Sequence, residues 1–289
     1  MKLVTFKTQG RTSIGKVVGD RIIDLPASSP GLPHSMREFL HGGPPLMAAA
    51  QSVSTGSTYA LDEVELLAPI PNPSKYLAVG LNYRKHVEEA ARLGMTIPET
   101  QLWFNKQVSC VHGPFAPLHL PAVSDKLDYE AELGVVIGRR CRHVSVENAR
   151  AMIAGYVVCN DVSVRDYQVR TQTMTLGKSF DTHGPIGPWI VTDDEVPDPH
   201  ALGIRAFVNG EVRQDSNTSD MLFNIYDQIA YLSTVMTLEP GDVLATGTPS
   251  GVGIGMVPPR FLKVGDVVRI EIDTIGHIQN VVVPEPSFV

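Results

Sequence analysis

Hydrophobic and polar residues alternate with a period of two near the start of the chain. This alternation predicts short strands at residues 2–7, 12–18 and 21–25, because successive side chains of a strand point to opposite faces. Two further stretches, 36–40 and 47–53, have the spacing of short helices. The opening part of the chain is therefore predicted to combine a small sheet with little helix.

A proline-rich segment follows at residues 68–74. Three of its seven residues are proline, which stiffens the backbone and removes backbone donors. We place a boundary there and expect a small N-terminal domain over residues 1–70 and a larger domain over residues 75–289. A unit of about 70 residues buries little surface by itself, so we expect it to depend on the rest of the chain.

The larger part of the chain is predicted to hold several strands and few helices. Residues 75–80 and 154–160 are mostly apolar and are predicted to be short buried strands. Residues 83–93 favour a helix that Gly94 ends. The remaining predicted strands are 128–138, 186–192, 203–213, 242–246 and 267–273, and the remaining predicted helices are 146–153 and 222–236. These elements make a mostly β protein of the α+β class.

Composition supports a strand-rich fold and argues against some classes of binding partner. The chain has 25 glycines and 22 prolines in 289 residues, a surplus that favours strands and turns over a helical bundle. The formal net charge of −7 argues against nucleic acid or an anionic membrane as a partner. No window approaches 18 uninterrupted apolar residues, so we expect no membrane span. Three cysteines without paired spacing are typical of a reducing compartment, and we expect a cytoplasmic protein.

Common nucleotide-binding, zinc and serine-hydrolase motifs do not occur in the sequence. Gly177-Lys178-Ser179 resembles the end of a phosphate-binding loop, but Gln172 stands where that motif needs glycine. HExxH and CxxC are absent, and Ser250 does not lie in a GxSxG turn. The candidate chemistry therefore rests on other residues.

Carboxylates gather at one predicted strand. Glu130 and Glu132 are two residues apart, so strand geometry puts both of them, with Asp128, on one face of strand 128–138. Asp161 directly follows an apolar run. Adjacent carboxylates repel one another unless a cation neutralises them, and hard oxygen ligands select Mg²⁺, Mn²⁺ or Ca²⁺ over zinc. A solvent-facing strand with scattered acids and an ordinary turn aspartate remain open as alternatives.

Three other features are candidates for catalysis or binding. His86 and Glu89 are spaced i, i+3 on the predicted helix, so the carboxylate can orient the imidazole as a general base, although an exposed pair has the same spacing. Lys178 is either a surface lysine or a group that stabilises negative charge on a substrate oxygen. The Thr-Gly-Thr-Pro segment at 246–249 either forms a plain turn or offers donors to a carboxylate.

The order of these motifs resembles the fumarylacetoacetate hydrolase superfamily. Five ordered blocks carry the resemblance: VGLNYRKHVEE (79–89), DYEAELGVVIG (128–138), GYVVCNDVSVRDYQ (155–168), LGKSFDTHGPIGPWIVT (176–192) and PGDVLATGTPSGVG (240–253). The layout is similar to the single-copy branch that contains acylpyruvases, 2,4-diketo-3-deoxy sugar acid hydrolases and oxaloacetate tautomerases. The resemblance implies a mixed β-sandwich roll with a small N-terminal domain, assembled as a homodimer.

The resemblance also implies roles for individual residues. The metal carboxylates are matched by Glu130, Glu132 and Asp161, which would hold Mg²⁺ or Mn²⁺, with Ca²⁺ as another occupant. The catalytic residues are matched by His86, Glu89 and Lys178, and the substrate-binding residues by Arg165, Gln168, Gly247 and Thr248. Met174, His183 and Val164 depart from the usual pattern, where tryptophan, phenylalanine and alanine are frequent. These departures flank the lysine and arginine loops, so they affect substrate identity and leave the metal chemistry in place.

The expected reaction is hydrolysis of a C–C bond in a 2,4-dioxo acid of the acylpyruvate or fumarylpyruvate type. His86, oriented by Glu89, would activate water, and the metal with Lys178 would stabilise the pyruvate enolate that leaves. The same first shell would serve an oxaloacetate tautomerase or decarboxylase, or a 2-hydroxyhepta-2,4-diene-1,7-dioate-type isomerase, so these stay open. A non-catalytic protein that binds 2-oxo acids is a third interpretation, and it would need the dyad or the lysine to be missing.

Overall fold

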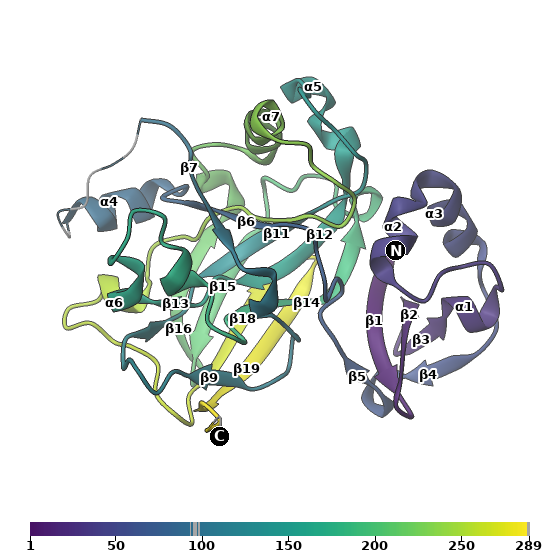
Figure 1. Cartoon of the computed structure of the whole chain (residues 1–289), viewed down its shortest axis with the longest axis horizontal. Coiled ribbons are helices and arrows are strands. Elements are labelled where there is room, and N and C mark those ends of the chain that lie inside the picture. Colours follow the sequence, from purple (N-terminus) through teal and green to yellow (C-terminus); the bar gives the residue numbers. More distant parts are fainter. Residues whose placement is uncertain (93, 95–96, 98, 288–289) are drawn as a thin grey trace.

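The protein is built mainly from strands, as the sequence predicts, and most of these strands lie in two sheets (Figure 1). The computed structural model describes residues 1–92, 94, 97 and 99–287. The larger sheet has twelve strands. Ten of them run in the order β4 (Thr58–Ala60), β3 (Arg21–Asp24), β2 (Arg11–Val18), β1 (Lys2–Thr8), β14 (Gly184–Thr192), β12 (Ile153–Asn160), β11 (Ala131–Ile137), β17 (Val243–Ala245), β6 (Tyr76–Gly80) and β7 (Leu102–Lys106). The other two are β5 (Glu65–Leu66), paired with β1, and β8 (Val111–His112), paired with β14.

The second sheet has five strands and holds the C-terminal part of the chain. Its order is β16 (Glu211–Asn217), β15 (Gly203–Val208), β18 (Val267–Ile272), β19 (Gly276–Pro284) and β9 (Leu118–Leu120). A separate two-stranded ladder joins β10 (Leu127–Asp128) to β13 (Ser163–Val164). Most pairings are antiparallel, but β17–β6, β14–β8 and β19–β9 are parallel, so the sheets are mixed.

Helices are short and lie around the sheets. They are α1 (Leu25–Ser28), α2 (Met36–His41), α3 (Gly43–Ser52), α4 (Arg84–Arg92), α5 (Val146–Ala149), α6 (Arg165–Gln168) and α7 (Ile225–Val235). Figure 1 shows α1, α2 and α3 beside β1 to β4, and α5 next to α7 at the top of the view. No helix within the described residues is long and apolar enough to cross a membrane.

A shared apolar core joins the first 70 residues to the rest of the chain. β1 pairs with β14 through Lys2–Val191 and Leu3–Ile190. Buried residues on both sides of the predicted boundary, such as Phe39 and Val157, belong to one hydrophobic cluster. The predicted split into domains over 1–70 and 75–289 stays a proposal, and residues 288 and 289 lie outside the described residues.

Most predicted elements form within a few residues of the expected positions, and the exceptions have local causes. The single strand expected at 203–213 is wrong, because β15 and β16 form a hairpin. Its turn residues Asn209 and Gly210 have φ angles of 52° and 79°, and Asn-Gly is the sequence that such a turn favours. The helix predicted at 83–93 is α4, and Leu93 lies outside the described residues.

Two further predicted elements are shorter than expected. The helix expected at 146–153 has only the four residues of α5, followed by a 3₁₀ turn at Arg150–Met152, because Ile153 already belongs to β12. The strand expected at 128–138 is interrupted at residues 129 and 130. Asp128 ends β10, which pairs with β13, and a new strand begins at Ala131. This interruption determines where the carboxylates lie.

Candidate active site

The carboxylates predicted at the strand do come together, and strand register is the reason. β11 and β12 are antiparallel, with Ala131 opposite Asn160. Glu130 and Asp161 are the next residues on these strands, and the Asp161 N–H donates to the Glu130 carbonyl oxygen at 3.0 Å. Glu132 is the second residue of β11. One carboxylate oxygen from each of Glu130, Glu132 and Asp161 lies within 4.8 Å of the other two, and all three residues are buried.

Asp128 does not extend this cluster as the alternation suggests. Because the strand is interrupted after it, its carboxylate accepts hydrogen bonds from the N–H groups of Gly253 at 2.7 Å and Ile254 at 2.9 Å. The Arg165 Nε also donates to Asp128 at 2.8 Å. Asp128 therefore holds a loop and an arginine in place beside the three clustered carboxylates.

Two buried lysines are paired with the carboxylates. Lys178 Nζ lies 2.7 Å from both Glu130 Oε2 and Asp161 Oδ2. Lys106 Nζ lies 2.6 Å from Asp161 Oδ1, and it also donates to the carbonyl oxygen of Lys178. Lys106 is not among the residues predicted for the site, and it ends the predominantly apolar stretch LWFNK. A charged residue inside such a stretch is the signal that could have found it.

The charges around the cluster leave one carboxylate without a cation. Burial would raise the pKa of Glu130, but the charges of Lys178 and Arg165 outweigh it and lower the pKa to about 2. Burial raises the pKa of Glu132 well above its ordinary value, and the charges of Asp161 and Glu130 add to the rise. Its only protein donor among the described residues is the Gly247 N–H, at 2.8 Å from Oε2.

This donor set fits a divalent cation. When all are ionised, the three clustered carboxylates and Asp128 carry four negative charges, and Lys106, Lys178 and Arg165 supply three positive ones, so the Glu132 carboxylate has no cation of its own. Buried charges are ordinarily paired or bound to metal. Hard oxygen donors of this kind suit Mg²⁺ or Mn²⁺.

Arg165 contacts the carboxylate cluster through Glu130 and lines the same cavity as Glu130 and Glu132. It begins α6, and its Nη1 donates to Glu130 Oε1 at 2.6 Å and to Gln168 Oε1 at 2.9 Å. Its Nη2 is buried and has no hydrogen-bond partner among the described residues. An unused guanidinium N–H at the cavity wall is a donor available to a bound carboxylate.

His86 and Glu89 form the pair that their spacing predicts. Both lie on α4, one turn apart, with His86 Nδ1 at 2.8 Å from Glu89 Oε2. The other oxygen, Glu89 Oε1, accepts from the Gly251 N–H at 3.1 Å, which fixes the carboxylate. The imidazole orientation thus leaves Nε2 as the nitrogen that is not held by Glu89.

A cavity of about 680 Å³ brings these groups together. Its polar wall includes His86, Glu89, Glu130, Glu132, Arg165, Gln168, Lys178 and Thr248. The remaining wall is largely apolar, with Leu102, Phe104, Val169, Met174, Val252 and Ile254. Gly247 is predicted to bind substrate, but its N–H donates a hydrogen bond to Glu132. Thr248 lines the cavity and accepts a hydrogen bond from Gln214 at 2.8 Å.

The family follows from sequence comparison together with this fold and site. Residues 75–283 match the family described as fumarylacetoacetate (FAA) hydrolase C-terminal, and residues 1–69 match one described as Rv2993c-like, N-terminal. The chain belongs to the fumarylacetoacetate hydrolase family. Its members that resemble this chain are enzymes, so this protein is an enzyme of that family and has its fold.

Similar members of the fumarylacetoacetate hydrolase family carry several activities in their names. Oxaloacetate tautomerase fahd2, mitochondrial, from Xenopus laevis is 44% identical over 98% of this chain and 90% of its own. Among solved structures, fumarylacetoacetate hydrolase from Exiguobacterium antarcticum has a TM-score of 0.87 at 37% identity, covering 99% of this chain and 100% of its own. Maleylpyruvate hydrolase from Sphingobium sp. SYK-6, in complex with manganese (II) ion and pyruvate, has a TM-score of 0.83 at 34% identity, with the same coverage.

Proposed function

We propose that this enzyme transfers a proton at the carbon next to the oxo group of a 2-oxo acid. One observation carries the proposal: the His86–Glu89 pair lines the same cavity as Glu130 and Glu132, which cluster with the buried Asp161. A base beside a cluster that can neutralise negative charge is the arrangement that enolate formation requires.

Glu130, Glu132 and Asp161 would hold a divalent cation, Mg²⁺ or Mn²⁺. When bound, such an ion supplies Lewis-acid polarisation and a template for an acid with two chelating oxygens. The manganese and pyruvate of the similar maleylpyruvate hydrolase support this assignment.

The remaining residues have separate tasks in the proposal. His86 would take the proton at Nε2, while Glu89 at Nδ1 holds the ring and stabilises the imidazolium that forms. The Lys178 ammonium would stabilise negative charge on the substrate oxygen. Arg165 would donate its unused Nη2–H to the substrate carboxylate, and Gln168 would hold Arg165 in position.

We propose oxaloacetate as the substrate and keto–enol interconversion as the reaction. The support is the similarity to oxaloacetate tautomerases over almost the whole chain, at 44% and 40% identity. Interconversion needs removal of a proton and its return to a different atom, which a single His–Glu pair can perform without an attacking water.

Hydrolysis of a 2,4-dioxo acid is the second candidate, and the cavity supports it. A volume of about 680 Å³ exceeds what a four-carbon acid fills, and Phe104, Met174 and Ile254 offer an apolar wall to an acyl group. His86 would then deprotonate water, and the water oxygen would bond to C4. The bond between C3 and C4 would break, and the enolate that leaves would take up the proton at C3, which gives two acids.

Product analysis separates the two candidates. The purified enzyme is incubated with Mg²⁺ or Mn²⁺ and either enol oxaloacetate or an acylpyruvate, and products are followed by NMR and absorbance. Faster conversion of enol to keto form without new acids indicates the tautomerase, and two new acids indicate the hydrolase. His86→Gln should abolish either reaction, whereas His34→Gln, an exposed histidine outside the cavity, should leave the rate unchanged. Full activity of the His86→Gln enzyme would contradict the proposal.

The cation site has its own test, which needs no substrate. Oxalate carries the two chelating oxygens of a 2-oxo acid, so Mg²⁺ and oxalate together should raise the unfolding temperature by several degrees, because a ligand at about a hundred times its Kd adds about 2.7 kcal/mol of stability. Glu132→Gln should remove this shift. An unchanged shift in that variant would rule out Glu132 as a ligand.

A further inference from the structure

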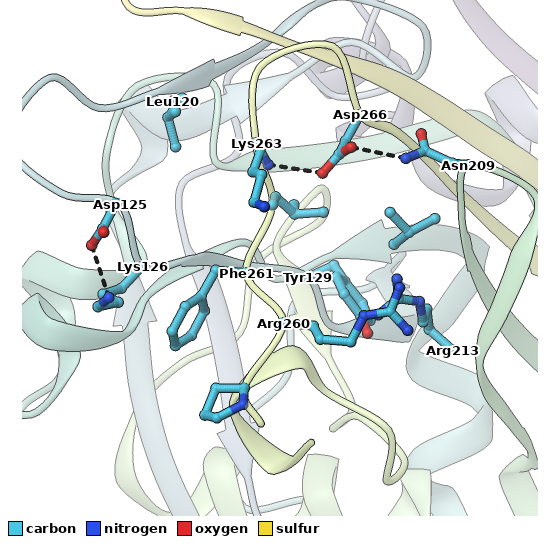
Figure 2. A pocket seen from close by; sticks show the side chains of 13 residues that line it. Leu120, Asp125, Lys126, Tyr129, Asn209, Arg213, Arg260, Phe261, Lys263 and Asp266 are labelled. Atoms are coloured by element: carbon cyan, nitrogen blue, oxygen red, sulfur yellow. Dashed lines mark hydrogen bonds and ion pairs between the residues drawn. The ribbon is translucent and has the colours of Figure 1, made fainter. Parts of the chain in front are cut away.

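A second pocket lies behind the strand that carries the catalytic carboxylates. It has a volume of about 400 Å³, and the loop from Pro259 to Lys263 forms one of its walls (Figure 2). The Tyr129 ring forms another wall, although Tyr129 stands between Asp128 and Glu130 in the chain. Neighbouring residues therefore line the two spaces, since Tyr129 lines this pocket and Glu130 lines the catalytic cavity.

Positive charge gathers in this second pocket, in a chain whose net charge is −7. Four cationic side chains line it: Lys126, Arg213, Arg260 and Lys263. Glu211 pairs with both arginines, at 2.7 Å from Arg260 Nη1 and 3.2 Å from Arg213 Nη2, so two guanidinium groups share one carboxylate. Arg213 is nearly buried, and its Nε has no hydrogen-bond partner among the described residues.

The two lysines of the pocket add to its positive charge. Lys126 contacts Asp125 at 3.0 Å and lies over the Phe261 ring. Within the described part of the chain, Lys263 makes no ion pair, because the Asp266 carboxylate accepts from the Lys263 backbone N–H and from Asn209 instead (Figure 2). Four cations face three acids, Asp125, Glu211 and Asp266, so the pocket keeps a net positive charge.

The other walls are aromatic and aliphatic. Phe261, Tyr129, Leu120 and Val208 line the same space as the charged groups. A compact apolar body would contact these side chains while its anionic oxygens reach Arg260 and Lys263. We propose that this pocket binds a small organic anion, a carboxylate with a compact apolar body, and that its occupation adjusts the catalytic pair.

Hydrogen bonds connect the pocket to the catalytic pair through one residue. The Tyr129 hydroxyl donates to the Gly251 carbonyl oxygen at 2.9 Å, and the Gly251 N–H donates to Glu89 Oε1 at 3.1 Å. A second contact holds the same loop, because the backbone N–H of Arg260 donates to the Gly253 carbonyl oxygen at 2.9 Å. A ligand that draws Arg260 and Tyr129 together therefore acts on the loop that positions Glu89.

Thermal unfolding with benzoate as the probe tests the binding site. Mn²⁺ and oxalate are present at saturating concentration so that the catalytic cavity is blocked, and chloride at equal ionic strength is the reference. Benzoate should raise the unfolding temperature of the wild-type enzyme, and inorganic phosphate should raise it less because it lacks the apolar body. The variant R260Q/K263Q should lose the benzoate shift. R205Q, which removes a half-exposed arginine paired with Asp273 outside the pocket, should keep it.

Each other outcome of that titration counts against the proposal. An absent shift in the wild type, or an equal shift in R260Q/K263Q, would show that benzoate does not bind here. An equal shift with phosphate would show that charge alone is recognised, which overturns the organic ligand class. None of these outcomes depends on which reaction the enzyme catalyses.

Turnover measurements test the connection to Glu89, and this step rests on the proposed function. At saturating substrate, benzoate should change kcat of the wild type by about fivefold or more, the range of ordinary coupling between two sites. Tyr129→Phe keeps the ring and removes the hydroxyl bond to Gly251, so it should bind benzoate as the wild type does while kcat no longer responds. Binding with no change of the wild-type kcat would overturn the connection, whereas an inactive wild type would refute the proposed function instead.

Discussion

At the scale of single residues, the site is a balance of buried charges. Glu130 and Asp161 are each held by Lys178, and Asp161 is also held by Lys106. Removing one partner of a buried ion pair typically costs about 3–5 kcal/mol, because the other charge remains buried. A bound cation would take over part of that neutralising role, so the effect of each lysine should depend on metal.

Lys106→Met tests this dependence. The variant should lower the free energy of unfolding of the metal-free enzyme by about 3 kcal/mol, and saturating Mn²⁺ should recover part of the loss because it neutralises Asp161. Urea unfolding with and without Mn²⁺ measures both quantities. Lys75→Met is the matched control. Lys75 Nζ lies 2.6 Å from the carboxylate of the buried Asp242, and neither residue belongs to the carboxylate cluster. Equal recovery by Mn²⁺ in both variants would contradict the interpretation.

His183 provides a prediction about pH. Burial lowers the pKa of this histidine from 6.5 to about 3, so the folded enzyme keeps it neutral while the unfolded chain protonates it below pH 6.5. The stability that this neutral histidine supports is present above pH 6.5 and is lost progressively as the pH falls towards 3. Between pH 6.5 and 5 the loss is about 2 kcal/mol.

His183→Phe should remove this part of the pH dependence, because phenylalanine does not titrate and still packs against Phe180. Denaturant unfolding at pH 6.5 and 5.0 gives the two free energies for each protein. The wild type should lose about 2 kcal/mol more than the variant over this interval. The same change at the exposed His34 should leave the wild-type dependence intact, and a His183→Phe enzyme that behaves like the wild type would show that His183 is not the group responsible.

At the scale of elements, close packing of two short segments positions Lys178. A 3₁₀ turn at Thr175–Lys178 lies directly against α6, and Gly177 has no room for a side chain, because an added Cβ would overlap the backbone of Gln168. The same contact therefore connects Lys178 with Arg165 and Gln168, which begin and end α6.

Gly177→Ala should separate these segments. Overpacking of this kind costs about 1–3 kcal/mol, and a displaced Lys178 should lower kcat/KM by about tenfold or more. Steady-state kinetics and the unfolding temperature are measured together. Gly113→Ala is the control, because its nearest neighbour would be at an ordinary contact distance of 3.5 Å. A Gly177→Ala enzyme with unchanged kcat/KM would show that this packing does not position the lysine.

At the scale of the whole molecule, the first 70 residues complete the core of the larger part. Leu3, Ile14 and Phe39 share one apolar cluster with Ile190 and Val243. Without β1, the edge of β14 and this apolar surface would be exposed to water.

Deletion of residues 1–70 should therefore leave a fragment that aggregates, or that unfolds at least about 10 °C below the full-length enzyme. The deletion should cost a few kcal/mol, and each kcal/mol lowers the unfolding temperature by several degrees. Solubility, the unfolding temperature and size-exclusion chromatography measure the effect. A monomeric fragment with the stability of the full chain would show that residues 75–289 fold independently. The same chromatography of the full chain tests the predicted homodimer.

The sequence by itself determined most of the strands and the family to which the chain belongs. Alternating apolar residues and turn signals predict most strands near their observed positions, because periodicity is a local property. The ordered motifs predict one site of His86, Glu89, Glu130, Glu132, Asp161, Arg165 and Lys178 through the family that they resemble, and the fold brings these residues close together. The Asn-Gly turn at 209–210 is equally local, and that dipeptide alone is enough to predict the hairpin of β15 and β16.

The tertiary structure alone decided which charges meet. Antiparallel register places Asp161 beside Glu130 across thirty-one positions of sequence, and the break after Asp128 turns that carboxylate towards the loop at Gly253. Lys106 reaches Asp161 from another strand, and Gly247 gives its N–H to Glu132. Such contacts depend on pairing between distant segments, which local pattern does not encode. For the same reason, only the fold brings Tyr129, which stands between Asp128 and Glu130, into the wall of a pocket that cationic side chains also line.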